Sequence, residues 1–407
     1  MESISDRVAI IGMGCTKFGE NWDMSIDDMI IDAAYEAYED AGIEPKDIQA
    51  AWYGTYVSGL CGQALATPLK LGYIPITRVE NLCATGSDAF RNACYAVAAG
   101  IYDIVLALGA EKFKDSGFSG LPDPRVSLGI FPEGEGHFRG QTRTNPANFA
   151  MMANKYFDKY GLSPEEGKRI IGQLEVKNHY NGSLHPKAHF QREITIEQVM
   201  NAPIIAWPLG LYDCCGVSDG AAAAIITRAD LAKNFRADPI YVKALQICVG
   251  PREGHISPTY DYAHVEETYR AGLAAYAEAG IKNPREEISM AELHDCFSIT
   301  ELVICEDLQF SPRGRAKEDV EAGRFALQGE QPINTDGGLK CFGHPLGATG
   351  LRMLYEEYKQ LQGKADELKN PGKPSRQVKN PRLGLTHNLG GVPGSATISV
   401  IIVGNEK

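Results

Sequence analysis

The 407-residue sequence lacks the features of a membrane, secreted or nucleic-acid-binding protein. Its longest apolar runs are about as long as a strand, far below the roughly 20 residues that a membrane-spanning helix needs. The N-terminal segment MESISDRVAIIGMGC places acidic residues before a short apolar run, whereas a secretory signal begins with basic ones. The net charge of -12 gives no excess of lysine and arginine for binding nucleic-acid phosphates. We therefore expect a cytoplasmic protein that binds neither membranes nor nucleic acids.

Paired cysteines are also missing, because the ten cysteines are scattered and no Cys-x-x-Cys pair occurs. Zinc-ribbon and redox motifs need such pairs, so we expect reduced thiols and no metal site. The GxxxxGK[ST] pattern of a nucleotide-hydrolysing loop is absent as well. What remains is the composition of a folded protein, with 44% hydrophobic and 23% charged residues.

An internal repeat organises the chain. Ala37–Ile43 reads AYEDAGI, and Ala275–Ile281 reads AYAEAGI. In each copy an Ala-rich helix ends at a glycine, and a turn then leads into a short β-prone run. Strand-like segments such as Ile104–Leu108 and Leu383–Thr386 alternate with helical stretches elsewhere. This pattern predicts an α/β protein with two similar halves.

The segment between the two halves has no counterpart in the second half. It is rich in glycine, proline and aromatic residues and then becomes helical, as expected for a substrate-covering insertion. We therefore expect a first half over residues 1–111 and 217–243, an inserted loop domain over 112–216, and a second half over 244–407.

Cys83 lies in the segment Thr77–Gly100, which reads TRVENLCATGSDAFRNACYAVAAG. A β-prone run feeds a sharp turn at the cysteine, and an Ala-rich helix then begins near Thr85 or Ser87. The free N–H groups and the positive dipole end at a helix N-terminus favour a thiolate, so we expect the pKa of Cys83 to lie below about 8.5. The alternative is a buried cysteine at a strand end, which is the ordinary role expected of Cys94.

A second candidate segment is Met290–Ser298, with the sequence MAELHDCFS. In an extended chain, residues two apart share a face, so His294 and Cys296 would point the same way. From this fragment alone, a core histidine beside a core cysteine is the favoured interpretation.

Two glycine-rich segments follow. His344 lies in TDGGLKCFGHPLGATGLR, where glycines allow a close approach of backbone to ligand and Pro345 suits the first turn of a helix. Gly390 and Gly391 lie in LTHNLGGVPGSA and can expose backbone N–H groups, as in an oxyanion hole. The alternatives are a simple turn or phosphate loop for the first segment and a hairpin turn for the second.

In this order and across nearly the whole chain, the four segments resemble the thiolase superfamily. That resemblance implies two similar βαβαβαββ halves in a five-layer αβαβα arrangement with an inserted loop domain. NLCATGSDAFRNA is similar to its nucleophile segment, GHPLGATG to its GHP motif and HNLGG to its final glycine turn, while HDCF is typical of the sterol-carrier-type and archaeal-type branch. Better-known thiolases carry an acid/base cysteine where this chain has Asn388, and the resemblance assigns that role to Cys296.

The resemblance implies covalent acyl transfer on Cys83, with His344 as its base and Cys296 as the acid that protonates the departing enolate. The Cys83 and Gly390 amides would hold the acyl carbonyl oxygen, and His294 with His344 the thioester enolate. The expected substrate is a 3-oxoacyl-CoA, acetoacetyl-CoA by default and an aromatic or dicarboxylic one as runner-up. Coenzyme A is the expected co-substrate, and no permanently bound cofactor is expected.

Two alternatives stay open. A decarboxylating, ketoacyl-synthase-type condensing enzyme of this fold would use Cys83, His294 and His344 without Cys296, and a non-catalytic acyl-CoA-binding scaffold subunit would keep only the fold. The resemblance also implies a homodimer or dimer of dimers and a small zinc-ribbon and OB-fold accessory protein in trans.

Ligand contacts in the inserted segment are open at this stage. Basic residues there either meet CoA phosphates or form a solvated helix face: Lys155, Lys159, Lys168 and Arg169. Aromatic residues there either line an acyl pocket or belong to the core: Phe131, Phe138, Phe149, Tyr156 and Phe157.

Overall fold

The computed structural model describes residues 3–116 and 144–407. The strands of this part of the chain are β1 (Val8–Cys15), β2 (Ala50–Gly54), β3 (Ile76–Val79), β4 (Ile104–Glu111), β5 (Ile204–Ala206), β6 (Leu209–Gly210), β7 (Gly220–Arg228), β8 (Ile240–Val249), β9 (Met290–Glu292), β10 (Leu383–Val392) and β11 (Ser395–Gly404). Its α-helices are α1 (Ile26–Ala41), α2 (Gln63–Leu69), α3 (Thr85–Ala98), α5 (Asn145–Lys159), α6 (Pro164–Leu184), α7 (Ile196–Met200), α8 (Glu253–Ile256), α9 (Glu266–Ala279), α10 (Pro284–Glu287), α11 (Ser298–Asp307), α12 (Ala316–Glu321), α13 (Gly338–Cys341) and α14 (Leu346–Leu361). None of these helices is long and apolar enough to cross a membrane.

The strands of both halves join into one sheet with the order β3-β2-β4-β7-β1-β8-β11-β10-β9. The join is short, because β1 and β8 pair only through Ala9 with Tyr241 and Ile10 with Ile240. On one side lie β3, β2, β4, β7 and β1, and on the other β8, β11, β10 and β9. In the second half, a single bridge between Ala291 and Ile333 takes the place that β3 has in the first half.

The two halves repeat the same order of elements, which confirms the predicted α/β fold of two βαβαβαββ halves. The order β1-α1-β2-α2-β3-α3-β4-β7 returns as β8-α9-β9-α11-Ile333-α14-β10-β11. The repeated AYxxAGI segments are the ends of α1 and α9, and each helix stops at a left-handed glycine, Gly42 with φ 68° and Gly280 with φ 76°. Glycine adopts this conformation without steric cost, so both helices end at equivalent points.

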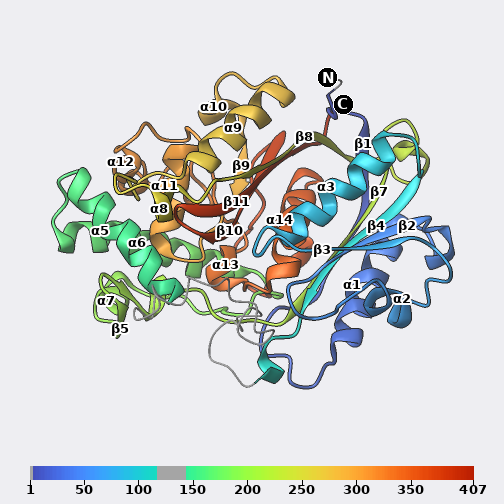
Figure 1. Ribbon diagram of the computed structural model, residues 1–407, viewed down its shortest axis with the longest axis horizontal. Coiled ribbons are helices and arrows are strands. Elements are labelled where there is room, and N and C mark those ends of the chain that lie inside the picture. Colours follow the sequence, from blue (N-terminus) through green and yellow to red (C-terminus); the bar gives the residue numbers. More distant parts are fainter. Residues whose placement is uncertain (1–2, 117–143) are drawn as a thin grey trace.

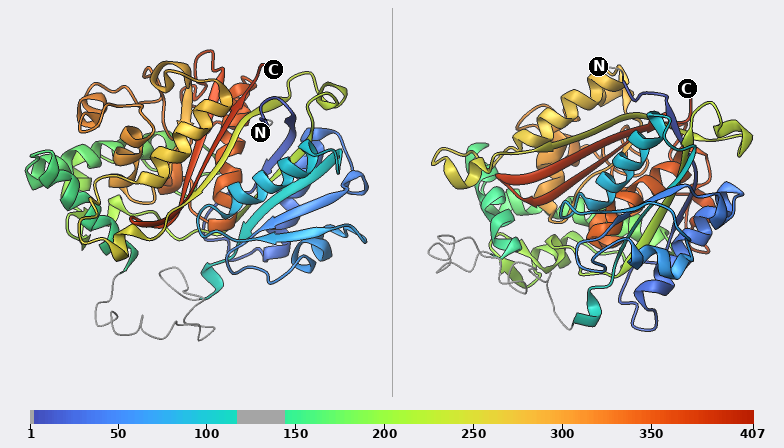
Figure 2. Two further views of the ribbon diagram at one scale, coloured as in Figure 1. Left: turned by 45° about the horizontal axis from the view of Figure 1, so that its top comes forward. Right: turned by 45° about the vertical axis from the view of Figure 1, so that its right-hand side comes forward.

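Helices α3 and α14 form the central layer of the molecule. They pack on each other between the two parts of the sheet, while α1 covers the outer face of the first half and α9 that of the second (Figure 1; Figure 2). The approach of α14 to β4 is so close that a Cβ atom on Gly109 would lie 1.8 Å from the Gly347 carbonyl oxygen. The start of α14 is therefore fixed against the sheet of the other half.

The described part of the inserted segment lies beside the second half. Helices α5, α6 and α7 and the β5–β6 hairpin gather on the side of β10 and α11 (Figure 1). Helix α6 packs on α11 and α13, so this segment encloses the region that follows β9.

Candidate active site

Cys83 lies in a tight turn between β3 and α3. Leu82 has φ 52°, a left-handed conformation that costs a non-glycine residue about 1–2 kcal/mol. The Asn81 amide donates to Thr85 Oγ1 at 2.8 Å, and the Ala84 amide donates to the Asn81 carbonyl at 3.1 Å. Helix α3 begins at Thr85, so the predicted helix start directly after Cys83 is confirmed.

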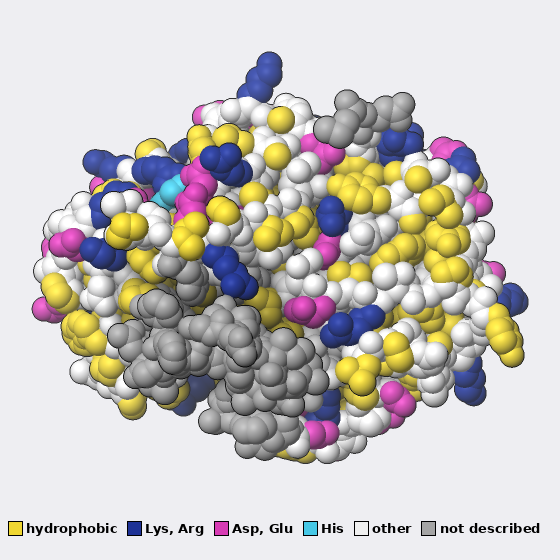
Figure 3. Space-filling model, in the orientation of Figure 1, with side chains coloured by type: hydrophobic (Ala, Val, Ile, Leu, Met, Phe, Trp, Pro, Cys, Tyr) yellow, Lys and Arg dark blue, Asp and Glu magenta, His cyan; other side chains and the backbone are white. Residues whose placement is uncertain are grey.

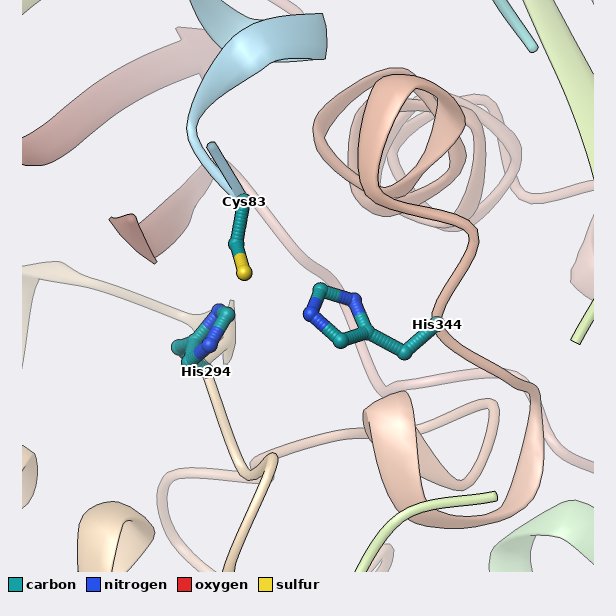
Figure 4. Close-up of side chains that lie close together, drawn as sticks. All are labelled: Cys83, His294 and His344. Atoms are coloured by element: carbon teal, nitrogen blue, oxygen red, sulfur yellow. The ribbon is translucent and has the colours of Figure 1, made fainter. Parts of the chain in front are cut away.

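Three of the predicted site residues come together. The Cys83 sulfur and one ring nitrogen from each of His294 and His344 lie within 4.8 Å of one another. The two imidazoles meet edge to face, with centroids 5.1 Å apart and an interplanar angle of 84°. Figure 4 shows the sulfur pointing toward the gap between the rings. Because Cys83 belongs to the first half and both histidines to the second, the packing of the halves creates the site.

Thr349 fixes the proton position on His344. The Nδ1 atom of His344 lies 2.8 Å from Thr349 Oγ1, and the Thr349 hydroxyl donates to the Pro345 carbonyl at 2.9 Å. The Thr349 oxygen is therefore left to accept, so Nδ1 carries the proton and Nε2 keeps its lone pair. Nε2 is buried, has no hydrogen-bond partner among the described residues and faces Cys83 (Figure 4). The sequence did not single out Thr349, although this residue lies in the same GHPLGATG motif as His344.

Both histidines are neutral. Burial lowers the pKa of His344 to about 3, and the Arg352 charge contributes. Burial also holds the pKa of His294 well below its ordinary value, with smaller effects from His344, His387 and Arg352. Neither ring nitrogen of His294 has a partner among the described residues. A neutral imidazole with a free N–H can donate to a ligand oxygen, which suits an oxyanion.

The predicted lowering of the Cys83 pKa is wrong. Burial raises the pKa of Cys83 to about 12, and hydrogen bonds to its sulfur from the Gly391 and Cys83 amides offset this only in part. Desolvation of a thiolate thus outweighs the helix N-terminus here. The pKa shifts of Cys83 and His344 both favour a neutral thiol beside a neutral imidazole over a thiolate–imidazolium pair.

Cys296 lies close to this group without belonging to it. Its side chain is buried, and its sulfur lies 4.0 Å from Thr300 Oγ1. Burial raises the pKa of Cys296 well above its ordinary value, and the nearby Cys215 and Cys83 thiols add to that effect. The Cys215 amide donates to the Cys296 carbonyl at 3.0 Å, which ties the end of the inserted segment to the HDCF motif.

Gly390 lies against the turn that carries Cys83. A Cβ atom at this position would lie 2.3 Å from the Asn81 carbonyl oxygen and 3.3 Å from the Cys83 amide nitrogen. Any side chain here would therefore displace the turn. Of the adjacent glycines Gly390 and Gly391, Gly391 donates its amide to the Cys83 sulfur, and it has φ 112°.

Asn388 is held in the core. It lies 2.5 Å from the Ser87 hydroxyl, which donates to its Oδ1 atom, and its amide nitrogen lies 3.2 Å from the Met353 sulfur. An amide does not titrate, so this position offers no acid/base group.

The basic residues proposed for CoA phosphates have different environments. Lys168 is buried and forms an ion pair with Asp213, so it is not available to a phosphate. Lys159 pairs with Asp261 at 2.5 Å, whereas Lys155 is exposed. Figure 3 shows basic and acidic side chains interspersed on this face, over the side where α9 and α12 lie.

The described aromatic candidates belong to the core of the second half. Phe149 stacks on Phe297, the residue after Cys296, with centroids 4.5 Å apart, and the Tyr156 hydroxyl donates to Glu306 at 2.5 Å. Phe157 is buried in the same cluster. Phe131 and Phe138 lie outside the described residues.

Fold and site together define a class of enzyme: two similar α/β halves place one cysteine beside two histidines, an arrangement that suits covalent acyl transfer. Residues 8–230 match the family "Thiolase, N-terminal domain", and residues 250–403 match the family "Thiolase C-terminal domain-like". The chain belongs to the thiolase family and is an acyltransferase.

Its relatives confirm the predicted branch. An acetyl-CoA acetyltransferase of Methanothermobacter thermautotrophicus is 39% identical over 399 residues, which cover 97% of this chain and 98% of the relative. The benzoylsuccinyl-CoA thiolase subunit BbsB of Thauera aromatica is 31% identical and covers 95% of each chain. The solved structure "Ltp2-ChsH2(DUF35) aldolase" matches with a TM-score of 0.82 at 26% identity over 100% of both chains.

Proposed function

We propose that the chain catalyses the CoA-dependent cleavage of a 3-oxoacyl-CoA, or the reverse Claisen condensation, through an acyl-Cys83 intermediate. The observation that carries this proposal is the Cys83 sulfur within 4.8 Å of a nitrogen on each of two neutral imidazoles. Similarity to an acetyl-CoA acetyltransferase supports acetoacetyl-CoA as the substrate. Similarity to a benzoylsuccinyl-CoA thiolase subunit supports an aromatic or dicarboxylic 3-oxoacyl-CoA as the second choice.

The first half-reaction transfers the acyl group to sulfur. As the Cys83 sulfur attacks the C3 carbonyl carbon, its proton passes to Nε2 of His344. The C2–C3 bond then breaks, and the electron pair stays on the departing acetyl-CoA as an enolate. His294 donates to the enolate oxygen, and the Cys296 thiol protonates C2. The products of this step are acyl-Cys83 and acetyl-CoA, with Cys296 left as a thiolate.

The second half-reaction returns the enzyme to its starting state. The Cys296 thiolate removes the thiol proton of a second CoA, and the CoA sulfur attacks the acyl carbonyl on Cys83. The bond between the carbonyl carbon and the Cys83 sulfur breaks, and the sulfur regains its proton from His344. In this scheme the Cys83 and Gly390 amides stabilise the negative oxygen that forms in both attacks.

The acyl-enzyme can be trapped directly. Incubation with acetoacetyl-CoA, acid quenching and intact-mass analysis should show one acetyl group per chain, located on the peptide that contains Cys83. A Cys83→Ala variant should lose the adduct, while the matched Cys94→Ala variant, which changes a buried cysteine on the helix that follows Cys83, should keep it. An unmodified chain, or the same adduct in Cys83→Ala, would contradict the proposal and would favour the scaffold alternative.

A decarboxylating condensing enzyme is the second candidate. It is favoured by one observation, that Cys83, His294 and His344 form a close group of three to which Cys296 does not belong. A Cys296→Ser variant separates the two candidates. Loss of both thiolysis and acetyl-CoA condensation supports the thiolase, whereas full condensation activity with a carboxylated extender thioester supports the decarboxylating enzyme.

We further propose that CoA is the co-substrate, without a permanently bound cofactor, and that the chain forms a cytoplasmic homodimer or dimer of dimers. We also propose its division into residues 1–111 with 217–243, 112–216, and 244–407. The Ltp2-ChsH2(DUF35) assembly supports an accessory protein in trans. Light scattering of the purified chain and mass spectrometry of proteins that co-purify with it test the assembly.

A further inference from the structure

We propose that Cys83, His294 and His344 bind one soft divalent cation, represented by Zn²⁺, and that the bound cation blocks the site. Zinc takes cysteine sulfur at about 2.3 Å and histidine nitrogen at about 2.0–2.1 Å in a tetrahedron. Ligand atoms in such a tetrahedron lie about 3.3–3.7 Å apart. The three donor atoms already lie within 4.8 Å of one another, so rotation of the side chains closes the remaining gap.

The two imidazoles are prepared as ligands. His344 presents the lone pair of Nε2, while its Nδ1–H is held by Thr349. A metal-binding histidine is usually oriented in this way, by a hydrogen bond from its other nitrogen. His294 is fully buried and neither of its nitrogens has a partner among the described residues, so it gives up no protein hydrogen bond when it binds a cation.

The sequence could not suggest this site, because zinc motifs are recognised by closely spaced cysteines and histidines. Here the donors come from the turns before α3 and α14 and from the segment after β9. Among the described residues no fourth side chain completes the group. Three protein ligands leave one position open for water or for an incoming thiol, as in metal sites that exchange ligands.

Binding releases one proton, because the Cys83 thiol becomes a thiolate when the sulfur–metal bond forms. The other ionisable groups that act on the three ligands are Glu80, Glu111, Cys215, Cys296, His387 and Arg352. Arg352 opposes a cation, while the two glutamates favour one.

The test uses the full-length protein after chelator treatment, with Zn²⁺ in equilibrium dialysis and Co²⁺ as a spectroscopic probe. We expect one Zn²⁺ per chain, a sulfur-to-cobalt charge-transfer band, and protection of Cys83 from iodoacetamide that a chelator reverses. Cys83→Ala and His294→Asn should each weaken binding at least 100-fold, whereas Cys61→Ser, which changes an exposed cysteine, should not.

The proposal would be overturned if Cys83→Ala and the unaltered protein bound Zn²⁺ with equal affinity, or if the sulfur-to-cobalt charge-transfer band were absent. Circular dichroism shows whether each variant is folded. Because metal binding is read without substrate, its failure is separate from a failure of the proposed thiolase reaction.

Discussion

Replacing Thr349 by valine tests how the site controls its base. Valine has the same shape as threonine but no oxygen, so the Nδ1–H of His344 loses the acceptor that now lies 2.8 Å away. The ring is buried, and a buried donor without a partner costs about 1–3 kcal/mol. The imidazole escapes this cost by moving its proton to Nε2, which faces Cys83. That tautomer cannot accept the thiol proton.

The size of the effect follows from this cost. A penalty of about 1–3 kcal/mol lowers the population of the productive tautomer about 5- to 150-fold, since 1.4 kcal/mol corresponds to a factor of ten. We expect kcat and the rate of Cys83 acylation to fall about 10- to 100-fold, the usual range for a residue that orients a reacting group. KM should change little, because Thr349 lies behind His344.

Pre-steady-state acylation by acetoacetyl-CoA and steady-state thiolysis measure both quantities. Thr349→Ser is the matched control, since serine restores the oxygen, and its kcat should stay within a few-fold of the original. The reasoning is refuted if Thr349→Val keeps its acylation rate and its pH–rate profile while Tm is unchanged, because the proton on His344 is then set by something else.

Three further substitutions have defined outcomes. Gly390→Ala forces a Cβ atom to 3.3 Å from the Cys83 amide nitrogen and should reduce acylation at least 100-fold, whereas Gly72→Ala, where an added Cβ meets nothing within 4 Å, should leave it unchanged. Arg352→Met removes the cation between two buried carboxylates at 2.6 Å each and should cost about 3–5 kcal/mol of stability in urea unfolding. Burial raises the pKa of Glu111 from 4.5 to about 7. The contribution of Glu111 to the free energy of unfolding is therefore present below pH 4.5 and is lost as the pH rises to about 7. Glu111→Gln should abolish this part of the pH dependence of the unfolding free energy.

Local sequence signals predicted the two similar α/β halves and three residues that the structure brings together, Cys83, His294 and His344. The repeated AYxxAGI segments predicted two equivalent helices because a left-handed glycine ends each one. The turn before an Ala-rich helix predicted the place of Cys83, and the helix does begin at Thr85. These features depend on residues close together in the chain, which is why the sequence contains them.

The electrostatics of the site could not be predicted in the same way. The helix N-terminus favoured a low pKa of Cys83. The direction of the pKa shift depends instead on how much protein surrounds the sulfur, and that protein comes from both halves. The role of Thr349 depends on its hydroxyl donating to Pro345, which only the three-dimensional arrangement shows. For Lys168 the sequence left a phosphate contact or a solvated helix face open, and the structure shows neither, because the side chain is buried and paired with Asp213.

The convergence of the two halves explains why these residues meet at all. Cys83 and His344 each lie just before a helix, so they come together only if the N-termini of α3 and α14 touch. Glycines allow this contact: a Cβ atom on Gly86 would lie 2.6 Å from the Gly347 carbonyl oxygen, and one on Gly350 would lie 2.5 Å from the Ser87 amide nitrogen. Side chains at either glycine would push the helices, and with them the sulfur and the imidazole, apart. The glycines of the two motifs therefore shape the contact between the halves, and the reactive pair depends on that contact.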